Sequence, residues 1–432
     1  MQVYRLSHPT RQIGTKEQPV LIHLNSSKSI SNRALIVNAL RGSVDPAEGI
    51  ENLSTAADTR ILLRLLRERP QVCDVGDGGT TFRFLTAFWA LQEGCRVLTG
   101  SARMQERPIG PLVDALKQLG VSLIEYLKRE GYPPLRICGP IRPRGAAHAQ
   151  VAVSAHVSSQ FVSALMLVGP YLPGGLRLKL TGPLVSASYI RMTRLLMEYF
   201  GAEVTQPDET TIVVEPGLYR FRPLRIEADW SAASYWYSIA ALAKSAHLVL
   251  EGLTDDSWQG DRMAAQMAIP FGVRTEFEWA DGRPRAYLYA APADESSAQP
   301  VHLDFTNCPD LAQTFIVLCA AKGQFATYDG LQTLPLKETD RCAALQAELP
   351  KIGIAFEKLS QAPTTYFSRK FANWNAPVRF STYGDHRMAM ALAPLALIKP
   401  IEIENPEVVD KSYPQFWEHL QQAGFTIEEF TI

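Results

Sequence analysis

Residues 28–40 read KSISNRALIVNAL, and the pattern of this stretch recurs along the chain. A few small or polar residues are followed each time by about a dozen mostly apolar ones, which is typical of a capped helix start leading into a buried helix. The six copies are KSISNRALIVNAL from Lys28, GTTFRFLTAFWAL from Gly79, SSQFVSALMLVG from Ser158, SAASYWYSIAALA from Ser231, PDLAQTFIVLCAA from Pro309 and GDHRMAMALAPLAL from Gly384. This recurrence predicts an α/β protein built from repeats.

A second, more amphipathic helix is expected at a nearly constant distance after each copy. The paired anchors Ser29/Asp58, Thr80/Ile109, Ser158/Tyr189, Ser231/Asp261, Asp310/Asp340 and Asp385/Gln415 are 29, 29, 31, 30, 30 and 30 residues apart. Five of the second helices end near a glycine that leads into strand-like residues, and glycine suits the left-handed residue that closes a helix. Ordinary α/β alternation would give similar runs without a fixed offset, so we favour a true repeat.

Six units of this size form either one solenoid or two globular groups of three. The connections lack the short, uniform length of a solenoid. We therefore expect two domains, one of residues 22–229 and one of residues 1–21 together with 230–432. Residues 1–21 precede the first unit, which leaves them available to pair with the last one. The chain would then cross between the domains twice, giving a double hinge and a cleft.

The composition excludes several classes of protein. Of the 432 residues, 46% are hydrophobic and 20% are charged, and 43 basic against 44 acidic residues give a net charge of −1. Such a chain buries a core and is neither disordered nor fibrous. Its balanced charge argues against a protein that coats nucleic acid. The N-terminus lacks the apolar core of a signal peptide, and no apolar run is long enough for a transmembrane helix.

The cysteines give no sign of a metal site. They are Cys73, Cys95, Cys138, Cys308, Cys319 and Cys342, and no two are spaced as C-x-x-C. No histidine stands at ligand spacing beside one, so we do not expect structural zinc. Their isolated, mostly apolar surroundings predict reduced thiols in a cytosolic protein.

Unusual polar residues gather at the starts of the first helices. The first start reads SSKSISNR from Ser26, and the second reads GDGGTTFR from Gly76. Free N–H groups and the helix dipole favour anions at such a start, and glycines let the backbone approach a ligand closely. Each start alone also fits a capped surface helix or a tight turn, and neither matches the P-loop or dinucleotide fingerprints.

Equivalent positions in several repeats present cations or proton carriers. If two three-unit domains face each other, these helix starts can converge on one cleft, which would suit a small substrate with several negative charges. The candidate cations are Lys28, Arg33, Arg83, Arg107, Arg341, Arg387 and Lys411. The candidate proton carriers are Asp310, Glu338 and His386.

Eight longer motifs occur in a fixed order: LNSSKSISNRALIVNAL, GDGGTTFRFLTA, RMQERPIGPLVDAL, YPPLRI, VSSQF, LVSASYI, LKETDR and GDHRMAMALAPLAL. Their ordered combination resembles the EPSP synthase (3-phosphoshikimate 1-carboxyvinyltransferase) family over nearly the whole chain. The resemblance implies two domains, each of three β-α-β-α-β-β units around a pseudo-threefold axis. It also implies transfer of the enolpyruvyl group of phosphoenolpyruvate to the 5-hydroxyl of shikimate 3-phosphate, with release of phosphate and without a metal or organic cofactor. This reaction lies on the route to chorismate and the aromatic amino acids.

The resemblance implies roles for individual residues as well. The catalytic residues would be Asp310, Glu338, Lys28 and His386, with Asp310 taking the proton of the 5-hydroxyl, Glu338 protonating the alkene carbon and Lys28 as a competing carrier. The contacts to shikimate 3-phosphate would be Lys28, Ser29, Arg33, Ser158, Ser159, Gln160, Ser186, Tyr189, Asp310, Thr333 and Lys337. The contacts to phosphoenolpyruvate would be Lys28, Gly79, Thr80, Arg83, Arg107, Gln160, Arg341, His386, Arg387 and Lys411.

Several positions depart from the family pattern, and two of them bear most on substrate affinity: Asp77 replaces a more typical asparagine, and Thr333 stands where an asparagine often contacts the substrate. The nearest alternative is the related enolpyruvyl transferase that acts on UDP-N-acetylglucosamine. Against it, the loop around RMQERPIG lacks the cysteine which that enzyme commonly carries.

Two alternatives come from other classes. The balanced charge disfavours an RNA-end-processing or RNA-binding protein on a related fold, and the retention of all three proton carriers disfavours a non-catalytic anion-binding relative. We expect a cytoplasmic, glyphosate-sensitive monomer that binds these small molecules but neither nucleic acid nor membranes.

Overall fold

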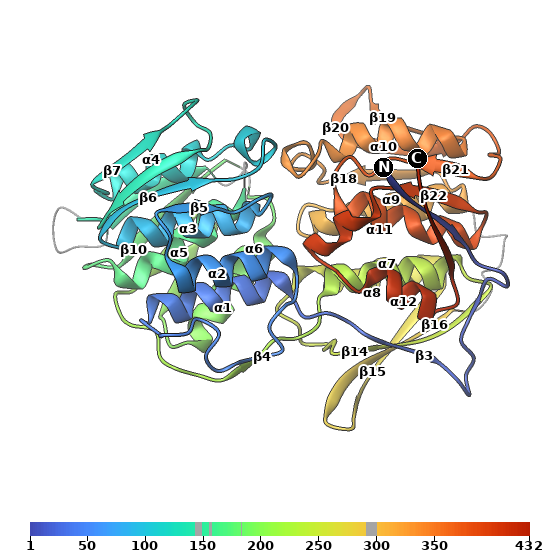
Figure 1. Ribbon diagram of the computed structural model, residues 1–432, viewed down its shortest axis with the longest axis horizontal. Coiled ribbons are helices and arrows are strands. Elements are labelled where there is room, and N and C mark those ends of the chain that lie inside the picture. Colours follow the sequence, from blue (N-terminus) through green and yellow to red (C-terminus); the bar gives the residue numbers. More distant parts are fainter. Residues whose placement is uncertain (143–148, 155–157, 183, 291–299) are drawn as a thin grey trace. The chain divides into compact units, whose positions relative to one another are not determined.

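The computed structural model describes residues 1–142, 149–154, 158–182, 184–290 and 300–432. The chain divides into two compact units, which are shown in Figure 1. The terminal unit comprises Met1–Ser26 and Glu227–Ile432, and the central unit comprises Ser27–Ile226. The boundaries expected from the sequence, at 21/22 and 229/230, differ from these by a few residues. Within the described residues, no helix has both the length and the apolar character that crossing a membrane requires.

Buried and amphipathic helices alternate along the described chain, as the repeat predicts. The first helix of the successive repeats is α1 (Lys28–Leu40), α3 (Gly79–Leu91), α5 (Ser159–Val168), α7 (Trp230–Leu242), α9 (Ala312–Lys322) and α11 (His386–Leu392). The second helix is α2 (Ala57–Glu68), α4 (Gly110–Gln118), α6 (Ala187–Tyr199), α8 (Met263–Met267), α10 (Arg341–Glu348) and α12 (Phe416–Gln422). The expected closing glycines are confirmed, because Gly120, Gly201, Gly272, Gly353 and Gly424 all have positive φ, between 75° and 92°.

Two helices are shorter than the sequence pattern suggests. Helix α8 has 5 residues and is flanked by 3-10 turns, one of which is η4 (Ile269–Phe271). Helix α11 gives way to a 3-10 turn, η8 (Ala393–Leu397). Proline explains both endings, since Pro270 and Pro394 lack the N–H that an α-helix needs and clash with the preceding turn.

Each complete repeat builds a small sheet with one strand order. The first strand pairs in parallel with the second, the second pairs antiparallel with the fourth, and the fourth pairs antiparallel with the third. Three such sheets are β5 (Val72–Asp74), β6 (Gly94–Thr99), β8 (Leu135–Gly139) and β7 (Leu123–Tyr126); β9 (Ala149–Ser154), β10 (Leu176–Thr181), β12 (Thr211–Val214) and β11 (Val204–Asp208); and β17 (Val301–Asp304), β18 (Ala326–Asp329), β20 (Ala362–Lys370) and β19 (Ile354–Leu359). Along the chain these give the β-α-β-α-β-β order that the family resemblance implies.

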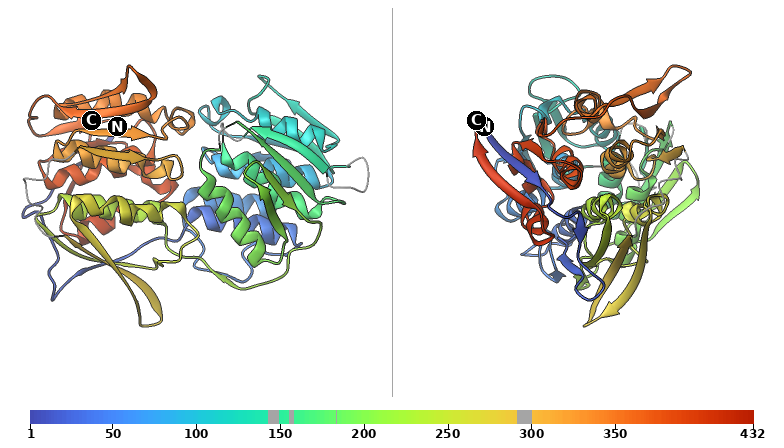
Figure 2. Two further views of the ribbon diagram at one scale, coloured as in Figure 1. Left: turned by 180° about the vertical axis from the view of Figure 1, so that it is seen from behind. Right: turned by 90° about the vertical axis from the view of Figure 1, so that its right-hand side faces the viewer.

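The N-terminus completes the last repeat. Strand β1 (Gln2–Ser7) lies between β22 (Ile401–Glu404) and β23 (Thr426–Thr431), antiparallel to both, and β21 (Val378–Phe380) forms the other edge. The two chain ends therefore lie side by side in both views of Figure 2, and the Met1 amino group donates to the Ile432 carbonyl at 2.8 Å. The pairing of the leading residues with the last unit is confirmed for β1.

Strands next to the two crossings are exchanged between repeats. The strand that precedes α1, β3 (Val20–His23), joins the sheet of β14 (Ser245–Glu251), β16 (Arg283–Ala290) and β15 (Val273–Ala280), to which β2 (Gln12–Ile13) also belongs. The strand that precedes α7, β13 (Leu224–Arg225), pairs instead with β4 (Ile50–Glu51) beside α1. The crossings are tied together where Asp229 N–H donates to the Asn25 carbonyl at 2.9 Å.

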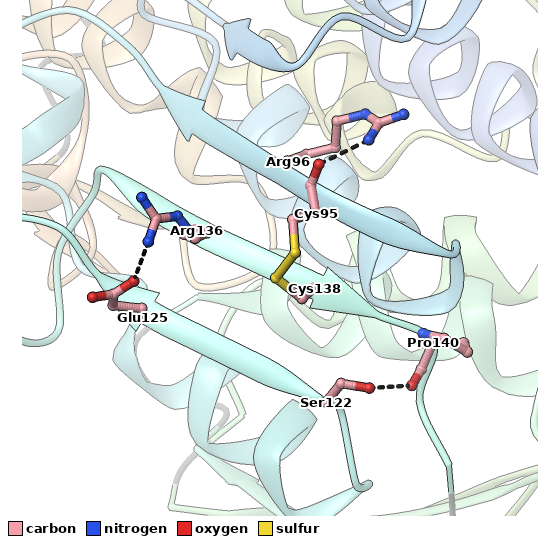
Figure 3. The surroundings of a disulfide bond; sticks show 7 residues. All are labelled: Cys95, Arg96, Ser122, Glu125, Arg136, Cys138 and Pro140. Atoms are coloured by element: carbon pink, nitrogen blue, oxygen red, sulfur yellow. Dashed lines mark hydrogen bonds and ion pairs between the residues drawn. A yellow bond between two sulfur atoms is a disulfide. The ribbon is translucent and has the colours of Figure 1, made fainter.

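Cys95 on β6 and Cys138 on β8 form a disulfide, shown in Figure 3. The expectation of reduced thiols is therefore wrong for this pair. The two residues face each other in the antiparallel register, with Cα atoms 4.1 Å apart. A separation of 43 residues hides this proximity in the sequence. Cys73, Cys308, Cys319 and Cys342 are free and buried.

Candidate active site

In the central unit, the start of α1 presents a lysine beside an acid. Ser27 caps the helix by accepting from the Ile30 N–H at 3.4 Å. The Lys28 ammonium then contacts Asp58 Oδ2 at 3.0 Å, on the first turn of α2. The lysine side chain keeps 15% of its surface exposed, against 7% for the aspartate. Lys28 is thus a cation held in place by an acid, with part of its side chain still open to solvent.

At the start of α3, two guanidinium groups converge over a glycine. A methyl group on Gly79 would lie 2.6 and 2.7 Å from the terminal nitrogens of Arg107, and 2.7 Å from Nη1 of Arg83. Arg83 also donates to the Gly79 carbonyl at 3.0 Å and to the Pro108 carbonyl at 3.3 Å. Two cations, a bare backbone position and a helix N-terminus together form an anion-binding geometry.

Asp77, the unusual acid of this loop, lies beside Arg107. Its carboxylate accepts from the Ser101 hydroxyl, while its carbonyl oxygen accepts from Arg107 at 3.4 Å. The carboxylate is therefore held against the loop that follows β6.

Side-chain contacts link the starts of the three first helices in this unit. Gln160, near the start of α5, donates to the Thr80 hydroxyl at 2.8 Å. Thr81 donates to the Asp58 carbonyl at 3.2 Å, which joins α3 to the acid that holds Lys28. Ser158 caps α5 by accepting from the Gln160 N–H at 3.2 Å. The structure thus brings most of the residues predicted for this unit to one end of the helices.

Arg33 is placed differently, because only 1% of it is exposed. It donates to the Thr193 hydroxyl at 2.7 Å, to the Ser29 carbonyl at 2.9 Å and to the Tyr189 carbonyl at 3.4 Å. Burial lowers the pKa of its guanidinium to about 10. Arg33 therefore fixes Ser29 and Tyr189 from beneath. Nearby, Ser186 adopts the left-handed conformation at the start of α6, with φ 57°.

In the terminal unit, Arg341 collects three acids. Its guanidinium donates to Asp385 at 2.7 Å, to Glu338 at 3.0 Å and to Asp310 at 3.3 Å. Burial lowers the pKa of Arg341, but the three carboxylates outweigh this and raise it overall. The arginine is thus a permanent cation that sets the spacing of the acids.

Arg387 forms a second bridge to the same acid. It donates to Asp310 Oδ2 at 2.8 Å, to the Asp310 carbonyl at 3.1 Å and to the Tyr235 hydroxyl at 3.3 Å. Burial raises the pKa of Tyr235 to about 12, so this hydroxyl keeps its proton at neutral pH. Lys337 approaches Asp310 from the other side, at 3.4 Å.

The remaining residues predicted for this unit lie around this cluster. Lys411, at the end of η9 (Pro406–Lys411), comes within 3.8 Å of Glu338. His386 is 1% exposed, and its Nδ1 lies 3.5 Å from Asp385. Thr333 is 8% exposed, just before the turn that leads to Lys337.

Sequence reasoning gave no role to three acids that organise the site. Asp58 pairs with Lys28, Asp385 pairs with Arg341, and Asp261 shares the Ser231 hydroxyl with Arg387. The constant offset between the two helices of a repeat points to Asp58 and Asp261, because Lys28–Asp58 and Ser231–Asp261 are each 30 residues apart. It does not point to Asp385, which stands 44 residues after Arg341. Within the described ranges, no group of three or more His, Cys, Asp or Glu side chains is arranged to hold a metal ion.

Comparison with known proteins identifies the family. The family model for EPSP synthase (3-phosphoshikimate 1-carboxyvinyltransferase) matches residues 64–420. A 3-phosphoshikimate 1-carboxyvinyltransferase of Bacteroides fragilis strain YCH46 is 42% identical, and the alignment covers 98% of each chain. The chain belongs to the EPSP synthase family.

A more distant EPSP synthase family member, the 3-phosphoshikimate 1-carboxyvinyltransferase of Vibrio cholerae strain M66-2, is 33% identical over 93% of this chain and 96% of that one. The solved structure of EPSP synthase from Acinetobacter baumannii superposes with a TM-score of 0.74 over 100% of both chains, at 20% identity. This second likeness concerns the fold and agrees with the predicted α/β repeats.

Membership of the EPSP synthase family fixes the reaction. The chain is a transferase that moves the enolpyruvyl group of phosphoenolpyruvate to shikimate 3-phosphate, a step of aromatic biosynthesis. The enzyme acts on small molecules, and the UDP-N-acetylglucosamine and RNA alternatives are not favoured.

Proposed function

We propose that the cations at the helix starts of the central unit and the acids around Arg341 in the terminal unit act on the same pair of substrates. Lys28, Gly79, Thr80, Arg83, Arg107, Gln160, Arg341, His386, Arg387 and Lys411 contact phosphoenolpyruvate. Ser29, Arg33, Ser158, Ser159, Gln160, Ser186, Tyr189, Thr333 and Lys337 contact shikimate 3-phosphate, together with Lys28 and Asp310. For Arg33 the contact is indirect and runs through Ser29 and Tyr189.

Charge supports this division of labour. Each phosphate carries about −1.5 to −2 charges at neutral pH, and each substrate adds a carboxylate. Two such anions approach each other only where cations offset the repulsion. Arginine grips a phosphate or carboxylate with two parallel N–H groups, whereas lysine acts as a point charge that can also move a proton.

The observation that carries the chemistry is the pairing of two acids by Arg341. Asp310 and Glu338 lie 3.3 and 3.0 Å from its guanidinium nitrogens, so their separation is fixed while both remain partly exposed. The reaction removes a proton from the 5-hydroxyl and adds one to the alkene carbon. We assign the first transfer to Asp310 and the second to Glu338, with Lys28 next to the reacting atoms as a competing carrier and His386 beside them. The adduct then loses phosphate.

Glu338→Gln tests this assignment. The amide keeps the size of the carboxylate but cannot carry the proton, so we expect kcat to fall by at least about 100-fold with little change in either KM. Phosphate release from both substrates together, with either one omitted as a blank, measures it. Glu357→Gln, an exposed glutamate on β19, is the matched control. A change confined to KM would make Glu338 a binding residue.

We also propose that the enzyme is a cytoplasmic monomer. Both substrates carry several negative charges and do not cross a lipid bilayer unaided, so the enzyme must work where they are made. The Cys95–Cys138 disulfide argues in the other direction, because reducing compartments keep thiols reduced. Alkylation of free thiols in intact cells, followed by mass spectrometry of the two peptides, decides between them. If Cys95 and Cys138 both escape alkylation in the cell, they are joined as a disulfide there, and the cytoplasmic location is overturned.

A further inference from the structure

Asp261 is a buried carboxyl group that forms no direct ion pair within the part of the chain that the structure describes. It lies in η3 (Gly260–Arg262), and 4% of it is exposed. Its Oδ2 accepts from the Ser231 hydroxyl, and its Oδ1 is buried with no hydrogen-bond partner in the described part of the chain. An ionised carboxylate in such a place is costly, whereas a protonated one is tolerated.

The corresponding acid of the first repeat has a different environment. Asp58 stands 30 residues after Lys28, as Asp261 stands 30 residues after Ser231. Asp58 therefore contacts an ammonium group, while the hydrogen-bond partner of the Asp261 carboxyl among the described residues is a hydroxyl. The charge of the acid is compensated directly in one repeat but not in the other.

The same serine connects Asp261 to the reaction site. Arg387 Nη2 donates to Ser231 Oγ at 3.4 Å and to Asp310 Oδ2 at 2.8 Å. A hydroxyl that accepts from Arg387 can still donate its own proton to Asp261. The order of contacts is thus Asp261, Ser231, Arg387 and Asp310, from the core of the terminal unit outward.

Charged groups from three other elements act on Asp261, and the Cys308 thiol also interacts with it electrostatically. Asp229 stands at the start of α7, Asp310 lies in η5 (Pro309–Leu311), and Arg387 lies on α11. Arg262, its neighbour in η3, is paired instead with Asp255. Burial, followed by the charge of Asp310, raises the pKa of Asp261 to about 7, against the lowering effects of Arg387 and Ser231.

We propose that Asp261 is a positioning residue whose loss of a proton, transmitted through Ser231, withdraws positive charge of Arg387 from the anionic substrate. With Asp261 protonated, the Asp310 carboxylate competes with the substrate for the charge of Arg387. With Asp261 ionised, a second carboxylate competes for the same guanidinium. The proposal rests on the proposed role of Arg387 in binding phosphoenolpyruvate.

The test is the pH dependence of KM for phosphoenolpyruvate in Asp261→Asn. Asparagine has the same shape but cannot ionise. The control is Asp256→Asn, which alters an exposed acid of the preceding loop. Between about pH 6 and about pH 8.5, KM of the control should rise several-fold more than KM of Asp261→Asn, with kcat similar in both. Because the substrate phosphate titrates in the same way in both assays, the difference between them belongs to Asp261. The proposal is overturned if the two variants show the same dependence of KM on pH. It is also overturned if Asp261→Asn loses kcat by the same factor at every pH.

A second variant keeps the proposal testable if Asp261→Asn folds poorly. Ser231→Ala removes the hydroxyl that connects Asp261 to Arg387, so this variant should lose the same pH-dependent rise of KM that Asp261→Asn loses. A pH profile of KM that matches the Asp256→Asn control would contradict the proposed link.

Arg387→Gln separates this proposal from the proposed function. If KM for phosphoenolpyruvate stays unchanged in that variant at all pH values, the binding role of Arg387 fails. The protonated carboxyl of Asp261 is then still tested directly by difference infrared spectroscopy. Its C=O band should disappear near neutral pH in the parent and be missing from Asp261→Asn, and a band with no such titration would overturn the proposal.

Discussion

Lys28 and Arg341 hold their charge in different ways. The Lys28 ammonium contacts Asp58 and keeps part of its side chain exposed, whereas Arg341 is 1% exposed and contacts three acids. A compact ammonium on a flexible stem can shift toward an incoming anion, while a buried guanidinium paired with three carboxylates cannot. Lys28 is thus suited to follow the substrates through the reaction, and Arg341 to keep the acids in place.

Lys28→Met should nearly abolish turnover while the protein stays folded. The change keeps the apolar stem but removes the charge next to two anionic substrates, so we expect kcat to fall by at least about 100-fold. It also removes a cation beside Asp58, which lowers stability. The double variant Lys28→Met/Asp58→Asn should recover much of that stability but none of the activity. Near-normal turnover in a folded Lys28→Met protein would exclude a central role for Lys28.

Gly79→Ala should weaken glyphosate more than phosphoenolpyruvate. The added methyl would meet the guanidinium groups of Arg107 and Arg83 at 2.6–2.7 Å, so both must move. Gly79 has an ordinary helical backbone in α3, so the fold should tolerate alanine. We expect KM for phosphoenolpyruvate to rise by about tenfold, equivalent to about 1.4 kcal/mol, and the inhibition constant of the longer glyphosate to rise further. Inhibition assays on both proteins measure this, and an equal proportional change would show that Gly79 does not discriminate by ligand length.

Asp261 should make the folded protein less stable as the pH rises. Its pKa is raised to about 7 in the folded state, above the ordinary aspartate value of 3.8. The folded state therefore binds the proton more tightly, and this contribution is complete below about pH 4 and lost as the pH rises through about 7. Urea unfolding at both ends of this window should show that the free energy of unfolding of the parent falls by at most about 4 kcal/mol as the pH rises. Asp261→Asn should lack this fall. If the variant and Asp256→Asn lose stability equally, Asp261 is ionised throughout.

At the scale of an element, the start of α11 combines capping with ion pairing. Asp385 Oδ1 accepts from the Arg387 N–H at 2.8 Å, and the same carboxylate receives the Arg341 guanidinium. Asp385 is fully buried. One carboxylate thus fixes the direction of α11, with Arg387 on it, relative to α10, with Arg341 on it.

Asp385→Asn should therefore cost more than an ordinary cap substitution. Asparagine caps a helix about as well as aspartate, but losing one partner of a buried ion pair costs about 3–5 kcal/mol. The control is Asp340→Asn on α10, an exposed cap that accepts from the Ala343 N–H at 3.0 Å. Thermal unfolding should show a lower Tm for Asp385→Asn and little change for the control. Equal Tm values would mean that the cap alone matters at α11.

The sequence predicts the helices of the repeats better than their ends and cross-links. The hydrophobic runs and closing glycines act locally, so α1, α3 and the five left-handed glycines could be expected. The shortening of α8 and α11 follows from single prolines inside otherwise helical patterns. The Cys95–Cys138 bridge depends on the register of two antiparallel strands, and no local pattern encodes that register. The ion pairs of Asp58 and Asp385 could not be predicted for a related reason. In the sequence, a helix cap or a surface charge explains each of these acids equally well.

At the scale of the whole molecule, the repeats are complete only because strands are exchanged. β1 pairs with strands of the last repeat, β3 pairs with a strand of the repeat of α7, and β13 pairs with a strand of the repeat of α1. The position of residues 1–21 ahead of the first unit suggested the first of these pairings. The other two follow from two short strands of 4 and 2 residues, which carry too little pattern to assign. The exchange ties each unit's first repeat to a crossing of the chain.

Shikimate 3-phosphate should make the molecule more compact. Only two stretches of chain join the units, at Ser26–Ser27 and Ile226–Glu227. The predicted substrate contacts are divided between the two units, and a bound polyanion offsets repulsion among their cations. Small-angle scattering at saturating shikimate 3-phosphate should therefore give a smaller radius of gyration than the free enzyme. Shikimate at the same concentration lacks the phosphate and should leave the radius unchanged. The effect should shrink at high salt, because screening weakens the repulsion in the free enzyme. If the radius of gyration stays constant when shikimate 3-phosphate is bound, the hinge does not close. Units that do not move would then have to make all the substrate contacts.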